Sequence, residues 1–235
     1  MVKLFRSFTG AVLLFILMVN VACENKPNDE NESKQVENEE QAVSQQNSED
    51  KQVIVFFGNS LTAGYGLEPE EAFPAIIQRY LDSLGYNYNT VNAGVSGETT
   101  ASGNSRVDWI LKQPMDIFVL ELGANDGLRG IDPVQTTINL QSIIDKVKAA
   151  KPEVTIVLAG MQVPPNMGAD YSDAFRNLYP ELAIKNKLPL IEFLLEGVGG
   201  DPTLNLPDGI HPTADGHQIV ADNVWYTLKD NIKTN

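Results

Sequence analysis

Cysteine and basic residues are scarce in this chain, and each shortage excludes a class of protein. One of the 235 residues is a cysteine, so no internal disulfide can support the fold. Lysine and arginine number 17 against 31 aspartates and glutamates, which gives a formal net charge of −14. Nucleic-acid binding needs a basic face, and docking on anionic lipid through charge needs a basic patch. We therefore expect no nucleic-acid partner.

Several sequence motifs are also missing. Neither the Gly-x-Gly-x-x-Gly dinucleotide fingerprint nor the phosphate-loop pattern follows the first apolar run. The Gly-x-Ser-x-Gly turn of the larger α/β-hydrolase class is absent, because Thr62 occupies the place of its second glycine. These absences argue against a nucleotide cofactor and against that hydrolase class.

The first 23 residues resemble a bacterial lipoprotein signal. Lys3 and Arg6 form a charged start, and the apolar stretch that follows ends just before Cys23. This stretch is too short for a transmembrane helix. In such signals the cysteine is acylated and becomes the new N-terminus, although Asn20 stands where leucine is usual. We expect export to the cell envelope of a bacterium, with membrane attachment through a lipid on Cys23; the alternative is a plain secreted protein.

Residues 24–52 differ in composition from the rest of the chain. Asn, Glu, Gln, Ser and Lys dominate this segment, which holds nine acidic and three basic residues. With almost no apolar side chains it cannot form a core, so we predict a disordered acidic linker. The linker separates the signal at 1–23 from a single domain at 53–235.

From residue 53 onward, strand-like and helix-like stretches alternate. The five apolar residues of Val53–Phe57 predict a strand that is buried on both faces. Asp132 followed by Pro133 predicts the start of a helix. The same reasoning predicts strands at 89–93, 116–122, 154–159 and 189–194, and helices at 70–84, 105–112, 133–150, 173–186 and 214–232. This alternation indicates an α/β fold with about five parallel strands and helices on both faces.

Residues that can carry chemistry follow the predicted strands. Ser60 comes after the first strand, Gly97 after the second and Asn125 after the third. Asp208 and His211 lie between the fifth strand and the last helix. Because the carboxyl ends of parallel strands share one edge of the sheet, we expect these five residues to converge there.

Their residue types suit acyl transfer. His211 can remove the proton of the Ser60 hydroxyl near neutral pH, and Asp208 can hold the other imidazole nitrogen. The backbone N–H groups of Ser60 and Gly97 and the side-chain amide of Asn125 can stabilise the negative charge that develops on the attacked carbonyl. The pattern therefore predicts a serine hydrolase site with an oxyanion hole.

Four motifs resemble those of the SGNH, or GDSL, family of serine hydrolases. GNSLTAGYG, SGET, LGANDGLRG and DGIHP fall in the order and at the spacing of that family, within Val53 to Trp225. The chain is especially similar to the bacterial periplasmic thioesterase/lysophospholipase and arylesterase branch. The resemblance implies a flavodoxin-like three-layer fold and a small acyl-ester or thioester substrate, with no metal and no cofactor.

The resemblance also implies residue roles. It makes Ser60 the nucleophile, His211 the base and Asp208 the acid, and it completes the oxyanion hole with Gly97 and Asn125. One position departs from the family, which usually has aspartate where this chain has Asn59. Asparagine keeps an acceptor oxygen, loses the charge and gains a donor. Because that aspartate is not the triad acid, we expect the Asn59→Asp change to have a modest effect.

Other interpretations use the same or neighbouring residues. A carbohydrate or peptidoglycan O-acetylesterase would need the same catalytic groups, and Asn59 would suit a binding module that has lost activity. His217, the second histidine, is expected to be a surface or packing residue. A zinc site built from Asp208, His211, Asp215 and His217 is disfavoured because Pro212 and Gly216 interrupt the helical spacing. The poorer nucleophile candidates, none directly after a strong strand, are Ser96, Ser102 and Ser105.

Overall fold

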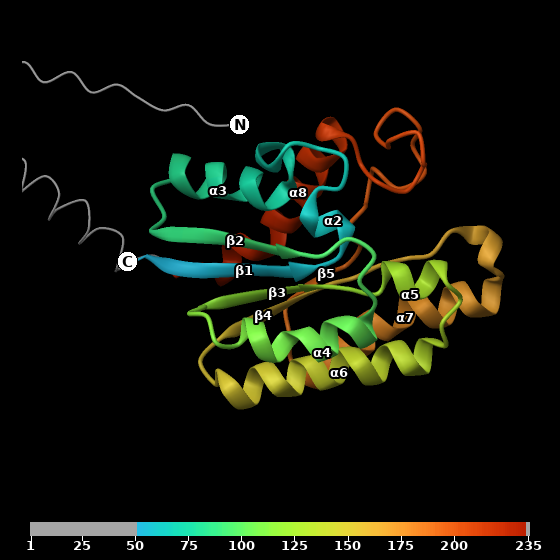
Figure 1. Ribbon diagram of the computed structural model, residues 1–235, viewed down its shortest axis with the longest axis horizontal. Coiled ribbons are helices and arrows are strands. Elements are labelled where there is room, and N and C mark those ends of the chain that lie inside the picture. Colours follow the sequence, from blue (N-terminus) through green and yellow to red (C-terminus); the bar gives the residue numbers. More distant parts are fainter. Residues whose placement is uncertain (1–50, 234–235) are drawn as a thin grey trace, which may run out of the picture. The chain divides into compact units, whose positions relative to one another are not determined.

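One parallel β-sheet organises residues 51–233, the part of the chain that the computed structural model describes (Figure 1). Its strands lie in the order β2-β1-β3-β4-β5, and every neighbouring pair is parallel. The strands are β1 (Gln52–Gly58), β2 (Tyr88–Gly94), β3 (Ile117–Glu121), β4 (Thr155–Ala159) and β5 (Leu190–Ile191). The predicted α/β fold with about five parallel strands is confirmed.

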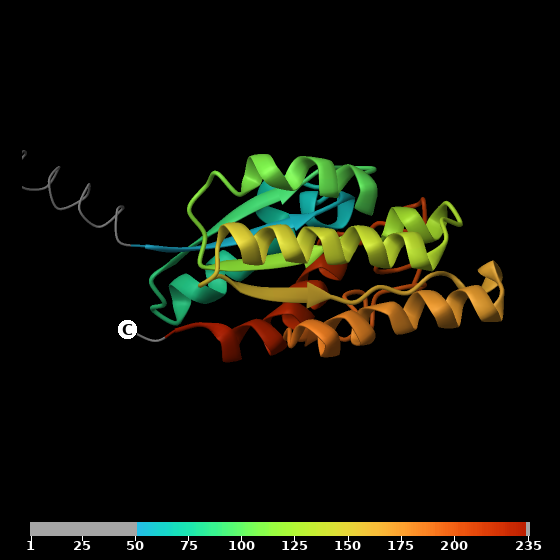
Figure 2. The same ribbon diagram turned by 90° about the horizontal axis from the view of Figure 1, so that it is seen from below.

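Helices cover both faces of this sheet and give the three layers. On one face lie α3 (Phe73–Ser83) and α8 (Ala214–Leu228), which pack against each other. On the other face lie α4 (Thr100–Ile110), α6 (Pro133–Ala150) and α7 (Ala169–Asn186). Figure 2 shows α6 between α4 and α7. Three layers with this strand order make the fold flavodoxin-like, as the resemblance implied.

Strand β1 shows why the sheet is buried on both faces. Successive side chains of a strand point to opposite faces. Phe56 packs edge-on against Phe73 of α3, with ring centroids 5.4 Å apart. Phe57 points the other way and stacks on Phe118 of β3, at 5.3 Å. Both faces of β1 therefore bury aromatic side chains, which accounts for its unbroken apolar run and holds its carboxyl end in place.

Several boundaries differ from the predictions. The helix expected at 105–112 begins at Thr100, because the Thr99 hydroxyl caps it by accepting from the Ser102 N–H. The helix expected at 173–186 begins at Ala169, and the fifth strand is much shorter than predicted. The helix expected at 70–84 is divided into η1 (Pro69–Glu71) and α3, and the one expected at 214–232 into α8 and η3 (Lys229–Asn231). Short helices that were not predicted are α2 (Ser60–Ala63), α5 (Ala124–Leu128) and η2 (Pro165–Met167). Capping and tertiary packing, rather than hydrophobic period, set these ends.

The predicted signal and almost all of the predicted linker lie outside the described residues. Cys23 and the rest of residues 1–50 are among these, so the expected lipid anchor stays a prediction. The strand β1 already begins at Gln52, one residue before the expected start of the domain. Within residues 51–233, no helix has the length and apolar character needed to cross a membrane.

His217 is a packing residue, one of the two roles expected for it. It lies on α8 with 1% of its surface exposed, and its ring faces that of Phe73. Its Nδ1 accepts a hydrogen bond of 3.1 Å from the Phe73 N–H at the start of α3. Burial, and to a smaller extent the nearby His211, lowers the pKa of His217 to about 4. The neutral imidazole therefore ties α8 to α3.

This depressed pKa predicts a loss of stability in acid. When the pH falls from about 6.5 to about 4, the unfolded chain protonates its histidine while the folded chain does not, which lowers the free energy of unfolding by about 3 kcal/mol. The His217→Gln variant keeps an acceptor for Phe73 but does not titrate. Urea unfolding at pH 7.5 and pH 4 should show a drop in the parent that exceeds the drop in the variant by this amount. Equal drops would contradict the assignment.

Candidate active site

Ser60 lies at the carboxyl end of β1, on the first turn of α2. The Asn59 side chain caps this short helix, because its Oδ1 accepts from the Leu61 N–H at 2.9 Å. Gly58 ends the strand, and a Cβ at this position would collide with Thr62 Oγ1 and with the Glu121 carboxylate. The strand, the glycine and the cap together present the Ser60 hydroxyl at the edge of the sheet.

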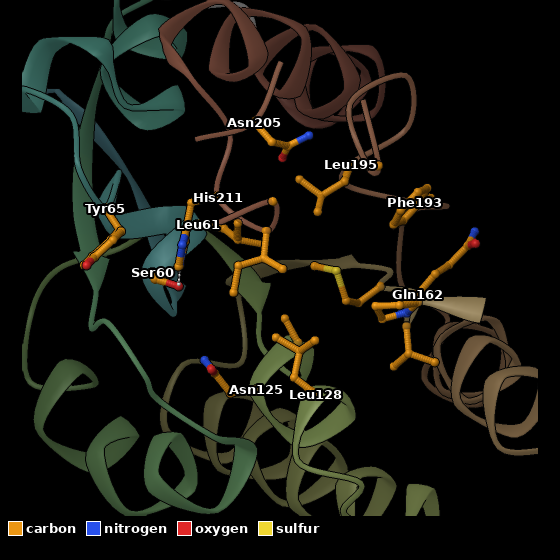
Figure 3. Close-up of a pocket in the computed structure, with 18 of the residues that line it drawn as sticks. Ser60, Leu61, Tyr65, Asn125, Leu128, Gln162, Phe193, Leu195, Asn205 and His211 are labelled. Atoms are coloured by element: carbon orange, nitrogen blue, oxygen red, sulfur yellow. Dashed lines mark hydrogen bonds between the residues drawn. The ribbon is translucent and has the colours of Figure 1, made fainter. Parts of the chain in front are cut away.

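The Ser60 hydroxyl meets an imidazole from the far end of the chain. His211 Nε2 lies 2.9 Å from Ser60 Oγ (Figure 3). On the other side of the ring, His211 Nδ1 lies 2.7 Å from Asp208 Oδ2. Asp208 and His211 sit in a turn just before α8, next to the bridge that pairs Asn205 with Pro212. The structure thus brings the predicted hydroxyl, imidazole and carboxylate into one hydrogen-bonded chain.

Asp208 is held in its ionised form. Its Oδ1 accepts from the N–H groups of Ile210 and His211, at 3.0 and 3.1 Å. These hydrogen bonds, with the Ile210 N–H contributing most and the His211 side chain next, lower the pKa of Asp208 to about 2. The carboxylate is therefore charged throughout the neutral range, although much of its side chain is open to solvent.

Gly97 and Asn125 line the same pocket as Ser60 and His211. Gly97 has a φ of 80°, in the left-handed region that favours glycine. Asn125 Nδ2 donates one hydrogen bond, of 3.0 Å, to the Glu98 carbonyl, so its second N–H is left for the pocket. Within residues 51–233, neither the Ser60 N–H nor the Gly97 N–H donates to another residue. Three donors are thus available in the pocket that Ser60 lines.

A partly buried ion pair supports the loop that carries Gly97. Arg106 of α4 donates hydrogen bonds to both carboxylate oxygens of Glu98, from Nε at 2.7 Å and from Nη2 at 2.5 Å. The same guanidinium donates to the Ala93 carbonyl and lies 4.1 Å from the centre of the Phe57 ring. The pair fixes the backbone next to Gly97, a role that sequence analysis did not find because the partners lie on different elements.

Tyr65 is a further neighbour of the imidazole that sequence analysis missed. Its ring centroid lies 4.5 Å from that of His211, and 51% of its surface is exposed. An aromatic face at this distance stabilises a cation more than a neutral ring. The motif GNSLTAGYG contains this tyrosine, but its spacing alone does not show what it contacts.

The site opens into a cavity of about 550 Å³. Away from the hydroxyl, its wall is mainly apolar, and Figure 3 shows Leu61, Leu128 and Leu195 around the cavity. The apolar wall includes Leu61, Leu128, Met161, Val163, Phe193, Leu195 and Ile210. Such a wall suits the hydrocarbon part of a ligand.

The competing candidates do not reach this arrangement. Ser102 exchanges a hydrogen bond with Thr99, and Ser105 donates to the Ala101 carbonyl. Ser96 lines the cavity, but the imidazole of the site is bonded to Ser60 instead. His217 is turned toward α3 and bound by a backbone N–H, so it does not join His211 in one site.

Comparison with known proteins identifies the family of this chain. The profile of the GDSL-like lipase/acylhydrolase family matches residues 56–219. The chain is 40% identical over 179 residues to Esterase TesA of Pseudomonas aeruginosa, an alignment that covers 76% of this chain and 88% of the relative. The chain belongs to the GDSL-like lipase/acylhydrolase family.

Two further similarities support the enzyme class. Thioesterase 1/protease 1/lysophospholipase L1 of Escherichia coli strain K12 is 39% identical over 170 residues, which cover 72% of this chain and 79% of the relative. The crystal structure of TesA superposes with a TM-score of 0.73 at 39% identity, covering 76% of this chain and 99% of that one. This member of the GDSL-like family is a carboxylic ester hydrolase, as predicted.

In this GDSL-like hydrolase, the unusual Asn59 has a buried partner. Its Nδ2 donates to Glu121 Oε1 at 2.7 Å, and its N–H donates to Glu121 Oε2 at 3.1 Å. Thr62 Oγ1 donates to the same Oε2 at 2.8 Å. Burial raises the pKa of Glu121 to about 7, while the hydrogen bonds from Thr62 and Asn59 oppose the rise. In the sequence, Glu121 falls within the strand predicted at 116–122 and has no assigned role. The feature that could have indicated a role was a carboxylate inside an apolar run.

Proposed function

We propose that Ser60 is the nucleophile of this ester hydrolase and that His211 and Asp208 activate it. The observation that carries the proposal is the continuous hydrogen-bonded chain from Asp208 through His211 to the hydroxyl, with links of 2.7 and 2.9 Å. A general base must lie within hydrogen-bonding distance of the proton that it removes, and Nε2 meets this requirement. The ionised Asp208 accepts from Nδ1–H, which leaves Nε2 free to accept from the serine.

The reaction then proceeds in two halves. Ser60 Oγ attacks the acyl carbon while His211 Nε2 takes its proton, and the bond to the leaving oxygen or sulfur breaks as His211 returns that proton to it. Water next attacks the acyl-serine, gives its proton to His211, and releases the acid as the proton moves back to Ser60 Oγ. Each half passes through a tetrahedral intermediate with one negative oxygen.

Three donors are placed to stabilise that oxygen. They are the backbone N–H groups of Ser60 and Gly97 and the second Nδ2 hydrogen of Asn125, all at the cavity wall. Removing one donor of this kind costs about 3–4 kcal/mol of transition-state stabilisation. Since the ion pair of Arg106 with Glu98 fixes the backbone beside Gly97, the Gly97 donor is in place before substrate arrives.

The cavity supports an acyl ester or acyl thioester as the substrate. Its apolar wall matches a hydrocarbon chain better than the hydroxyl-rich surface of a sugar, which favours this substrate over an O-acetylated carbohydrate. The relatives named esterase and thioesterase/lysophospholipase point the same way. We further propose that residues 1–23 direct export and that a lipid on Cys23 holds the enzyme in the cell envelope, with 24–52 as the linker.

Covalent labelling tests the proposal. A fluorophosphonate probe reacts with an activated serine, so the parent protein should be labelled and the Ser60→Ala variant should not. Ser102→Ala, a change at another serine of the same region, is the matched control and should be labelled like the parent. An unlabelled parent would indicate a binding module without esterase activity, and labelling that survives in Ser60→Ala would place the nucleophile elsewhere.

A further inference from the structure

The Asn59 side chain, which caps α2, is hydrogen-bonded to a carboxylate that has no part in the proposed mechanism. Glu121 is 1% exposed and Asn59 is fully buried. Glu121 receives hydrogen bonds from the Asn59 N–H, the Asn59 amide and the Thr62 hydroxyl. These groups come from the residues on either side of Ser60 and Leu61, so the carboxylate holds the turn that carries the hydroxyl at both ends.

The oxygen of the Asn59 amide faces the catalytic side. Asn59 Oδ1 accepts from the Leu61 N–H at 2.9 Å and lies 3.4 Å from Ser60 Oγ. The orientation of this amide is decided at its other end, because only its NH₂ group can donate to Glu121 Oε1. A carboxylate at position 121 therefore fixes which atom of Asn59 caps the helix next to the nucleophile.

We infer that Glu121 is a positioning residue for Ser60, acting through the Asn59 amide, and that asparagine at position 59 suits an ionised glutamate at position 121. An aspartate at position 59 would set two carboxyl groups against each other, and such a pair must share a proton. The amide instead supplies a donor at every pH. The inference rests on the proposed role of Ser60 as the nucleophile.

Within residues 51–233, no lysine, arginine or histidine forms a hydrogen bond or an ion pair with Glu121. All of its hydrogen-bond partners in the described chain are neutral donors. Among neighbouring titratable groups, Tyr179 of α7 donates to the Leu122 carbonyl, and Asp126 of α5 accepts from Thr100. Glu98, near the start of α4, is paired with Arg106. With a pKa raised by burial to about 7, Glu121 depends on Asn59 and Thr62 for its charge.

A set of three variants tests the pairing. In Glu121→Gln two amides face each other and one donor loses its acceptor. At pH 8 and above, where Glu121 of the parent is mostly ionised, kcat and the labelling rate should therefore fall about tenfold or more, with KM unchanged. In Asn59→Asp both rates should stay near those of the parent at pH 6 and fall about tenfold by pH 9, as the shared proton leaves. In the double variant the new carboxylate at position 59 would accept from the new amide at position 121. One negative charge then returns to the pair, so the rates should recover to within about threefold of the parent.

Several outcomes decide the inference. Glu153→Gln, an exposed glutamate before β4, is the matched control and should behave like the parent. Thermal melting identifies a variant that does not fold; if Glu121→Gln is one, the pH dependence of Asn59→Asp decides alone. The positioning role is overturned if Ser60-dependent labelling is unchanged in both single variants, or if the double variant is worse than either. By contrast, a parent that is not labelled through Ser60 overturns the proposed function itself.

Discussion

Replacing His211 with alanine is expected to lower kcat for ester hydrolysis by about a million-fold, the largest effect of any single change in this protein. In the proposed mechanism, the imidazole removes the proton from Ser60 and later returns one to the leaving group. Within the described chain, the one other acceptor that contacts Ser60 Oγ is the weakly basic amide oxygen of Asn59. The measurement is kcat with a short-chain aryl ester, with and without a second change of Ser60→Ala. Because the two residues act as one unit, the double variant should be no slower than the slower single variant.

The second histidine supplies the control for this experiment. His217→Gln alters a buried contact with α3 and leaves the hydrogen-bonded chain at Ser60 intact, so its kcat at neutral pH should match that of the parent. A His211→Ala variant that keeps more than a hundredth of the parent rate would mean that another group accepts the serine proton. Fully additive losses in the double variant would mean that the two residues do not act together.

Exchanging Asp208 for asparagine is expected to lower kcat by about ten-thousand-fold, although the side chain keeps its shape. The N–H groups of Ile210 and His211 both donate to Oδ1, so they hold the oxygen of the new amide in that place. The NH₂ group then faces His211 Nδ1, which must become an acceptor. The imidazole proton moves to Nε2, and Nε2 can no longer accept from Ser60.

A surface carboxylate that contributes only its charge should behave differently from Asp208, because it does not fix the tautomer of His211. Asp215→Asn, a change in the first turn of α8, removes the same charge nearby and should change kcat by less than twofold. In the parent the pKa of Asp208 is about 2, so the loss of activity in mild acid should not follow protonation of this carboxylate. An Asp208→Asn variant with a tenth or more of the parent rate would show that the carboxylate does not set the tautomer.

Much of the fold follows from local patterns in the chain. Buried strands are predicted at Val53–Phe57 and at the apolar run of residues 117–120. Side chains that are apolar on both faces indicate a central strand, which is covered on both sides. Asp132 and Pro133 mark the start of α6 because a cap and a fixed φ act within one turn. The helix starts at Thr100 and Ala169 were missed because neither first turn carries an apolar stripe.

Part of the active site also follows from the sequence, and the rest depends on contacts between distant residues. Ser60, Gly97, Asn125, Asp208 and His211 could be named from residue type and from their places after strands, since parallel strands deliver their ends to one edge. The 2.9 Å contact between Ser60 and His211 spans 151 positions, and no local pattern contains it. No local pattern contains the ion pair of Arg106 with Glu98 beside Gly97, or the contact of Tyr65 with the imidazole.

The order of residues along this chain was enough to determine a parallel α/β sheet with Ser60, Asp208 and His211 at its edge. Only the tertiary structure decided what lies next to Ser60: Glu121, 62 positions from Asn59, accepts a hydrogen bond from the amide that caps α2. The physical reason is the separation along the chain between the residues that interact. Helix caps, strand burial and turn chemistry depend on neighbours within a few residues, whereas the protonation and orientation of a buried pair depend on which strands the fold places side by side.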